Sequence, residues 1–143
     1  MLVVSRQAFD QLVALAYDRY PEEACGLIGG PPGDSTAIQF YPCRNVAASA
    51  RVYTIDPKDH LLAERDADDR GWEIIGVVHS HTHTEPYPSQ TDVAQAPDPT
   101  WHYVIVGLKR EVPEVRSYCI VDGGIAEEPI HVERNDGDRR DID

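Results

Sequence analysis

The residues of this sequence that are best suited to do chemistry lie in one polar stretch, residues 79–92, directly after an apolar run. His79 and His81 stand two apart, and on an extended backbone side chains at this spacing point to the same side. Their ring nitrogens can therefore share one metal ion, to which Asp92 can add a carboxylate oxygen. Three protein ligands leave the fourth tetrahedral position to water, as in catalytic zinc sites. The stretch predicts a hydrolytic zinc centre.

A structural explanation of the same residues stays open at this level. Ser89 and Asp92 have the spacing of a capping box, so they can begin a short helix over residues 89–96. Histidines are also more often structural or solvated than metal-binding. Capping and metal binding are compatible, because the Asp92 carboxylate has two oxygens.

The complete pattern consists of His79-Ser80-His81, seven residues, Ser89, two residues and Asp92. It resembles the H-[ST]-H-x7-S-x2-D signature of the JAMM (MPN-plus) zinc metallopeptidases. The resemblance implies an α/β protein with the MPN fold, a mixed central β-sheet flanked by helices, similar to the cytidine deaminase-like architecture. It also implies one Zn²⁺ per chain, held by His79, His81 and Asp92 with a catalytic water.

The register of this pattern is unique. A histidine pair formed by His81 and His83 would place Thr91 and Ala94 where the serine and the aspartate belong, and would supply no carboxylate. We therefore expect His83 to be a loop residue that binds no metal. Other zinc hydrolase signatures fail, because the sequence contains no H-E-x-x-H and no P-C-x-x-C.

The JAMM pattern has a second element, a glutamate in an E-x-x-G-L context, which Glu23 to Leu27 matches. Glu22 has the wrong offset to Gly26, and we expect strand alternation to turn it to the other side. The resemblance implies that Glu23 takes a proton from the attacking water and passes it to the leaving amine. It implies that Ser89 donates a hydrogen bond to the developing oxyanion.

Residues 21–26 and 117–123, outside the metal pattern, resemble the actinobacterial Mec-type members of this family. Mec-type peptidases remove a cysteine from the Gly-Gly end of a ubiquitin-like sulfur carrier protein (CysO-like) in cysteine biosynthesis. The resemblance implies such a carrier as the substrate. It leaves open an (iso)peptidase with other ubiquitin-like or peptide substrates. It also leaves open a non-catalytic MPN assembly module, against which the retained site residues argue.

The elements that must position these residues follow from periodicity. Helical spacing of apolar residues predicts a helix over residues 5–20, and Asp56-Pro57 predicts the start of a second helix that ends before Gly71. Pro129 predicts that the last strand is an edge. Short apolar runs, and a hairpin turn at residues 122–124, predict strands over residues 25–28, 36–41, 51–55, 74–78, 101–108, 115–121 and 125–132.

Length and composition set the remaining expectations. The 143 residues, 41% apolar and 27% charged, predict one catalytic domain over residues 1–132 and a charged, flexible tail over residues 133–143. The net charge of −12, with no local basic patch in the sequence, argues against nucleic acid as a partner. The N-terminus has no signal-peptide pattern and no run could span a bilayer, so we expect a cytoplasmic protein without a membrane partner. Three dispersed cysteines predict free, mostly buried thiols. The sequence does not indicate the oligomeric state.

Overall fold

The helices and strands largely follow the periodicities of the sequence, and the computed structural model describes residues 1–134 of the chain. In chain order the elements are β1 (Leu2–Val4), α1 (Arg6–Arg19), β2 (Cys25–Gly30), β3 (Thr36–Ala37), β4 (Gln39–Cys43), α2 (Pro57–Asp69), β5 (Glu73–His81), α3 (Gln90–Ala94), β6 (His102–Gly107), β7 (Glu114–Val121), β8 (Gly124–Glu128) and β9 (Ile130–Val132).

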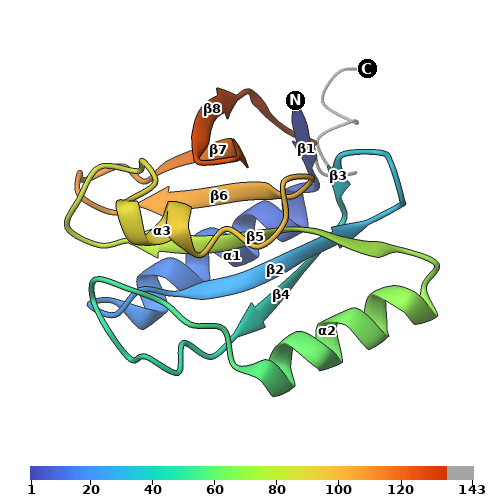
Figure 1. Cartoon of the computed structure of the whole chain (residues 1–143), viewed down its shortest axis with the longest axis horizontal. Coiled ribbons are helices and arrows are strands. Elements are labelled where there is room, and N and C mark those ends of the chain that lie inside the picture. The colour runs from blue at the N-terminus through green and yellow to red at the C-terminus, as the bar shows by residue number, and fades with distance from the viewer. Residues whose placement is uncertain (135–143) are drawn as a thin grey trace.

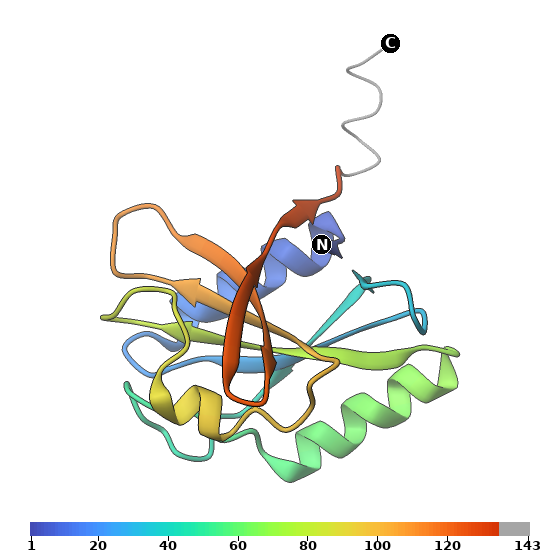
Figure 2. The ribbon, with the colours of Figure 1, turned by 45° about the horizontal axis from the view of Figure 1, so that its top comes forward.

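A mixed sheet carries the fold. In the described part of the chain, six strands pair in the order β4-β2-β5-β6-β7-β8, and three shorter ones form a second sheet, β3-β1-β9. In the larger sheet β5 and β6 are parallel, and the other neighbours are antiparallel. Helix α1 lies on one face of it, and α2 and α3 lie on the other (Figure 2). The predicted α/β architecture with a mixed sheet flanked by helices is confirmed.

Strand alternation builds a core on each face of this sheet. Val78 packs in the cluster that contains Leu12 of α1, whereas its neighbour Val77 packs in the cluster that contains Ala63 of α2. All four are at most 3% exposed. Full burial of a side chain such as valine or leucine contributes about 1.5–3 kcal/mol, so both helices are held to the sheet mainly by these contacts.

The two predicted helix starts are confirmed by their caps. The Ser5 side chain accepts a hydrogen bond from the backbone N–H of Ala8 and begins α1. The Asp56 side chain accepts one from Lys58, and Pro57 occupies the first turn of α2. A capped start satisfies N–H groups that have no partner within the helix.

Three strand predictions need correction, and one strand was missed. The predicted strand over residues 36–41 is two strands in different sheets, β3 in the smaller and β4 in the larger. The predicted strand over residues 51–55 is wrong, because this segment is a loop with one isolated bridge, between Asn45 and Ile55. The predicted strand over residues 125–132 is two strands, which separate at Pro129: β8 is an edge of the larger sheet and β9 an edge of the smaller. Strand β1 was not predicted; it pairs with β3 and β9, both distant in sequence.

The ends of the chain complete the description. Of the predicted C-terminal tail, Glu133 donates a backbone hydrogen bond to Val4, and residues 135–143 lie outside the described residues. Through residue 134, no helix is long and apolar enough to cross a membrane.

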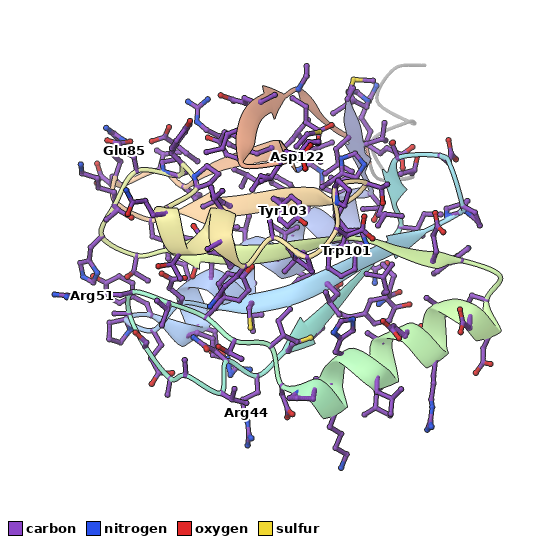
Figure 3. All side chains as sticks on the ribbon, in the orientation of Figure 1. Arg44, Arg51, Glu85, Trp101, Tyr103 and Asp122 are labelled. Carbon is purple, nitrogen blue, oxygen red and sulfur yellow. The ribbon has the colours of Figure 1, made fainter. Side chains whose placement is uncertain are left out.

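Two long loops meet at one end of the large sheet. The loop between β4 and α2 and the loop between β5 and α3 both lie at the left-hand end of the sheet in Figure 1. Arg51 marks the first loop and Glu85 the second, at the same end in Figure 3. Strand β5 ends there at His81, so this end carries the candidate site.

Candidate metal centre

Strand β5 presents both histidines of the H-x-H pair to one point. The strand continues through His81, so His79 and His81 lie on extended backbone, as predicted. Both residues are buried, at 3% and 4% exposure, and their Nε2 atoms are 3.1 Å apart. The prediction that the two side chains point to the same side is confirmed.

Helix α3 brings Asp92 to the same point. Asp92 Oδ2 lies 3.2 Å from His79 Nε2 and 3.0 Å from His81 Nε2. The predicted capping box at Ser89 is also present: Asp92 N donates to Ser89 Oγ, and Ser89 N donates to Asp92 Oδ2. We expected each Asp92 oxygen to have its own role, but one oxygen, Oδ2, faces the histidines and also accepts the cap bond.

The spacing of these three atoms fits a tetrahedral zinc ion. Zinc ligand atoms lie about 2.0–2.2 Å from the metal, so two ligands of a tetrahedral ion are roughly 3.3 Å apart. The distances among His79 Nε2, His81 Nε2 and Asp92 Oδ2 are 3.0–3.2 Å. The set needs little rearrangement to hold the ion.

The protonation states of His79 and Asp92 suit a metal. Burial alone would lower the pKa of His81, but its hydrogen bonds to Asp92 and Glu85 outweigh burial and raise that pKa, so a metal displaces a proton when it binds His81. His81 Nδ1 lies 2.8 Å from the carbonyl oxygen of Glu85, to which a ring N–H donates, and this tautomer leaves the Nε2 lone pair free. Burial lowers the pKa of His79, which favours its neutral form. Burial alone would raise the pKa of Asp92, but hydrogen bonds from His79 and His81 outweigh it and hold that pKa below its usual range. Neutral imidazole and ionised carboxylate are the metal-binding forms.

Glu23 lies beside this cluster, just before β2. Ala24 anchors it to β5, because Ala24 N donates to Ser80 Oγ and Ser80 N donates to Ala24 O. Glu23 is 4% exposed and Glu22 is exposed, as predicted, although the reason given was wrong, because neither residue lies in the strand. Glu23 Oε1 is buried and has no hydrogen-bond partner among the described residues.

Glu23 and Asp92 compete for the role of third ligand, and distance separates them. A carboxylate oxygen of Glu23 and ring nitrogens of His79 and His81 fall within 4.8 Å of one another, so Glu23 too belongs to a group that can hold a metal. Asp92 Oδ2 is at most 3.2 Å from the Nε2 atoms of His79 and His81, which is close to the separation of two ligand atoms on one zinc ion. Burial raises the pKa of Glu23 from 4.5 to about 7. An oxygen without a partner and a pKa near neutrality fit a proton acceptor better.

Gly26 of the E-x-x-G-L pattern has a packing reason. A Cβ atom at this position would lie 2.5 Å from both the Phe40 ring and the Tyr41 carbonyl oxygen. Strand β4 pairs with β2 at this point, Gly26 opposite Pro42. Only glycine therefore allows β4 to approach β2 this closely.

The structure places the remaining predicted residues at the rim. Ser89 is exposed, and its hydroxyl oxygen accepts the cap bond, which leaves the hydroxyl hydrogen available for donation. His83 is exposed and lies outside the cluster: its ring nitrogens are 3.2 Å from the Tyr20 hydroxyl and 2.8 Å from Thr82 Oγ1.

Sequence reasoning missed a contact from the β4–α2 loop. The Tyr53 ring stacks on the His79 ring, with centroids 4.3 Å apart and planes 20° apart. Tyr53 was predicted to lie in a strand, and no spacing in the sequence relates it to His79. Burial raises the pKa of Tyr53, so its hydroxyl stays neutral.

Another group of metal-binding residue types lies elsewhere, on β6, β7 and β8. His102, Cys119 and Glu128 offer atoms within 4.8 Å of one another. His102 Nδ1 is only 2.6 Å from Glu128 Oε2, which is shorter than the roughly 3.3 Å between two zinc ligands and typical of a charge-assisted hydrogen bond. Ser117 Oγ donates to the same oxygen. We interpret this group as a hydrogen-bond network that ties three strands together.

The two grooves beside α1 lie away from the site. Grooves of about 490 and 510 Å³ run along the two sides of α1. Mainly apolar residues line both, and neither includes a residue of the His79, His81 and Asp92 cluster. The cluster is identified by its converging donor atoms.

Comparisons with known proteins agree with this geometry. The family described as prokaryotic homologs of the JAB domain matches residues 5–121. The CysO-cysteine peptidase of Mycobacterium tuberculosis is 38% identical over 133 residues, covering 92% of this chain and 91% of the relative. The desampylase of Haloferax volcanii is 35% identical over 86 residues, covering 59% and 62%. The solution structure of a Desulfitobacterium hafniense protein superposes with a TM-score of 0.86 at 31% identity, covering 94% of each chain.

Proposed function

Because this chain belongs to the family of prokaryotic homologs of the JAB domain, the JAMM/MPN peptidases, we propose that it is a zinc-dependent peptidase for ubiquitin-like carrier proteins. It hydrolyses the amide that follows the C-terminal Gly-Gly of a sulfur carrier. The leaving group is cysteine, which places the enzyme in cysteine biosynthesis.

The observation that carries the zinc assignment is the triangle of His79 Nε2, His81 Nε2 and Asp92 Oδ2, with sides of 3.0–3.2 Å. These three residues are the ligands in the proposal. When bound, zinc supplies Lewis acidity, which polarises the scissile carbonyl and activates water for attack. Three protein ligands suit this role because they leave a coordination position for the reaction.

Glu23 is the general base and then the general acid of the proposed reaction. Its buried Oε1, which has no other partner in the described part of the chain, accepts the proton of the attacking water. The same carboxyl then delivers that proton to the leaving amine as the C–N bond breaks. A pKa near 7 suits both steps, because the group must gain and lose a proton at neutral pH.

Ser89 stabilises the charge that develops on the carbonyl oxygen. Its hydroxyl accepts from Asp92 N and keeps one O–H for donation, and the residue is open to solvent, where a substrate can approach. Loss of one such donor typically costs 10²–10³-fold in kcat.

The relatives support the choice of substrate. A CysO-cysteine peptidase and a desampylase both match the chain, the first over 92% of it. The longer match favours a CysO-like carrier with a cysteine leaving group. An (iso)peptidase for other ubiquitin-like conjugates is the second candidate, favoured by the desampylase match. A non-catalytic assembly module would have no use for the buried Glu23 Oε1, which has no hydrogen-bond partner among residues 1–134.

Mass spectrometry of a carrier that ends in Gly-Gly-Cys tests the proposal. The purified, zinc-loaded protein should convert it to a carrier lighter by one cysteine residue, and a chelator should stop the conversion. A second carrier that bears a lysine-linked peptide on its Gly-Gly end tests the other candidate. If only the second carrier is cleaved, the substrate is an isopeptide conjugate and not a carrier with a terminal cysteine. If neither carrier is cleaved, the proposal is refuted.

A further inference from the structure

We propose that Asn45 is a positioning residue of this enzyme: its side-chain amide aims Glu23 and holds the loop of residues 45–54 against the metal centre. This inference rests on the proposed function, because it assigns a role in the same reaction. Asn45 lies on the β4–α2 loop and is half-buried. It is not part of the JAMM pattern, and no pattern in the sequence indicates a function for it.

The Asn45 side chain uses all of its hydrogen-bonding capacity. Nδ2 donates to the carbonyl oxygens of Glu23, at 3.0 Å, and Val52, at 3.1 Å. Oδ1 accepts from the backbone N–H groups of Ala47, at 3.0 Å, and Thr54, at 2.9 Å. An amide has two N–H donors and two acceptor lone pairs, so none remains for solvent. The partners also fix its orientation, because a flipped amide would face carbonyls with its oxygen and N–H groups with its nitrogen.

The loop holds both backbone groups of Glu23. Its carbonyl oxygen accepts from Asn45, and its N–H donates to the carbonyl oxygen of Ser49 at 2.8 Å. Glu23 precedes β2, which begins at Cys25, so the sheet ladder does not reach it. Pairing with β5 holds the neighbouring Ala24, whereas the backbone groups of Glu23 itself bond to the loop. The direction in which the Glu23 carboxylate points therefore also depends on the loop, and through it on Asn45.

The other end of the loop contacts the metal-binding side of the site. Tyr53, whose ring stacks on His79, lies between the two residues whose backbone groups bond to Asn45. Thr82, next to His81, donates from its hydroxyl to the Ala50 carbonyl oxygen at 3.5 Å. In Figure 3 the loop leaves β4 near Arg44 and reaches the histidine end of the sheet at Arg51. The Asn45 side chain thus connects Glu23, the proposed proton acceptor, to the segment whose Tyr53 ring packs on His79.

Two substitutions, compared with each other, separate the role of the donating Nδ2 from that of the accepting Oδ1. Asn45→Asp keeps an oxygen for Ala47 and Thr54 but turns a carboxylate, which cannot donate, toward the carbonyls of Glu23 and Val52. Asn45→Ala removes all four bonds. Ser49→Ala is the matched control: its hydroxyl accepts from Arg51 and Val52 within the same loop, and its removal spares every bond of Asn45.

We expect both Asn45 variants to bind one zinc per chain and to lose kcat by roughly 10²-fold, the cost of about a 1 Å misplacement of a reacting group. Their KM should change by less than roughly threefold, since no contact with the substrate is lost. Ser49→Ala should keep kcat within roughly threefold of the wild type. Amide hydrogen exchange at Glu23 should accelerate in both Asn45 variants, and less in the control. Exchange at Thr54, whose N–H donates to Asn45 Oδ1, should accelerate in Asn45→Ala.

Each outcome decides the matter. Wild-type kcat in Asn45→Asp, or a loss that appears in zinc content or KM alone, overturns the positioning role. A loss in Ser49→Ala equal to that in Asn45→Asp would mean that general loosening of the loop is the cause, and also overturns it. The exchange measurement needs no substrate, so unchanged exchange at Glu23 refutes the inference even if the wild type cleaves no carrier. Inactivity of the wild type toward every carrier refutes only the proposed function.

Discussion

Replacing Glu23 with glutamine should slow the enzyme and, at the same time, stabilise the metal-free protein at alkaline pH. The substitution keeps the shape of the side chain and removes its charge. Glu23 is 4% exposed, and its Oε1 has no partner in the part of the chain that the structure describes, so the ionised form is poorly solvated. The same desolvation that raises its pKa to about 7 opposes folding whenever the carboxyl is charged.

The size of the stability effect follows from the pKa. A rise from 4.5 to about 7 corresponds to about 3 kcal/mol, and relaxation around the charge should reduce this to about 2 kcal/mol. Because the pKa is raised in the folded protein, the favourable contribution of Glu23 is complete below pH 4.5 and is lost as the pH rises through about 7. The free energy of unfolding of Glu23→Gln minus that of the wild type should therefore increase by about 2 kcal/mol from pH 4 to pH 8. This corresponds to roughly 4–8 °C in Tm.

Loss of the proton acceptor should lower kcat by about 10²–10⁴-fold while zinc content stays at one per chain. Glu22→Gln is the matched control, because Glu22 is the adjacent carboxylate and is exposed. It should leave both kcat and the pH dependence of stability nearly unchanged.

The assays are urea titration of zinc-free protein at several pH values and turnover of a Gly-Gly-Cys carrier by zinc-loaded protein. The difference between the stability curves isolates the charge, since any effect of the amide on packing is independent of pH. A difference that stays flat from pH 4 to pH 8 would refute the burial argument. Comparable loss of kcat in Glu22→Gln and Glu23→Gln would refute the assignment of the base.

Three further predictions follow from the site and its surroundings. His79→Ala should abolish zinc binding, measured by metal analysis, while His83→Ala should keep one zinc per chain; the reverse would mean that the register is wrong. A carrier whose last glycine is replaced by valine should lose nearly all turnover in the peptidase assay, since we expect a tight backbone slot there; equal rates would sink the carrier-specific assignment. Burial raises the pKa values of Cys25 and Cys43 to about 12, so at pH 8 iodoacetamide should label them far more slowly in the folded than in the denatured protein, and fast labelling by mass analysis would contradict their burial.

The cluster of His79, His81 and Asp92 could be predicted because its geometry is local. Residues two apart on a strand share a face, so His79 and His81 needed only the correct strand assignment. Residues at the first and fourth positions of a capping box lie within one helical turn, so Ser89 predicts where Asp92 points. Such relations depend on backbone periodicity, which a sequence displays directly.

The misassigned segment illustrates the opposite case. Residues 51–55 contain Val52, Tyr53 and Ile55, residue types that favour strands, so the segment was predicted to be a strand. In the folded chain the Asn45 side chain takes the bonds that a strand neighbour would make, accepting from Thr54 N and donating to the Val52 carbonyl. Asparagine competes with regular structure through its side chain in this way, and strand propensity does not register it.

By itself, the sequence predicted the proposed ligand set, the caps of α1, α2 and α3, and the order of the main elements, because each depends on residues a few positions apart. Only the tertiary structure decided what surrounds the proposed metal centre. Glu23 reaches the histidines because β2 pairs with β5, and Tyr53 reaches His79 because Asn45 folds its loop back. These contacts join residues 26–58 positions apart, and their free energy comes from packing and hydrogen bonds that form only when the whole sheet is assembled.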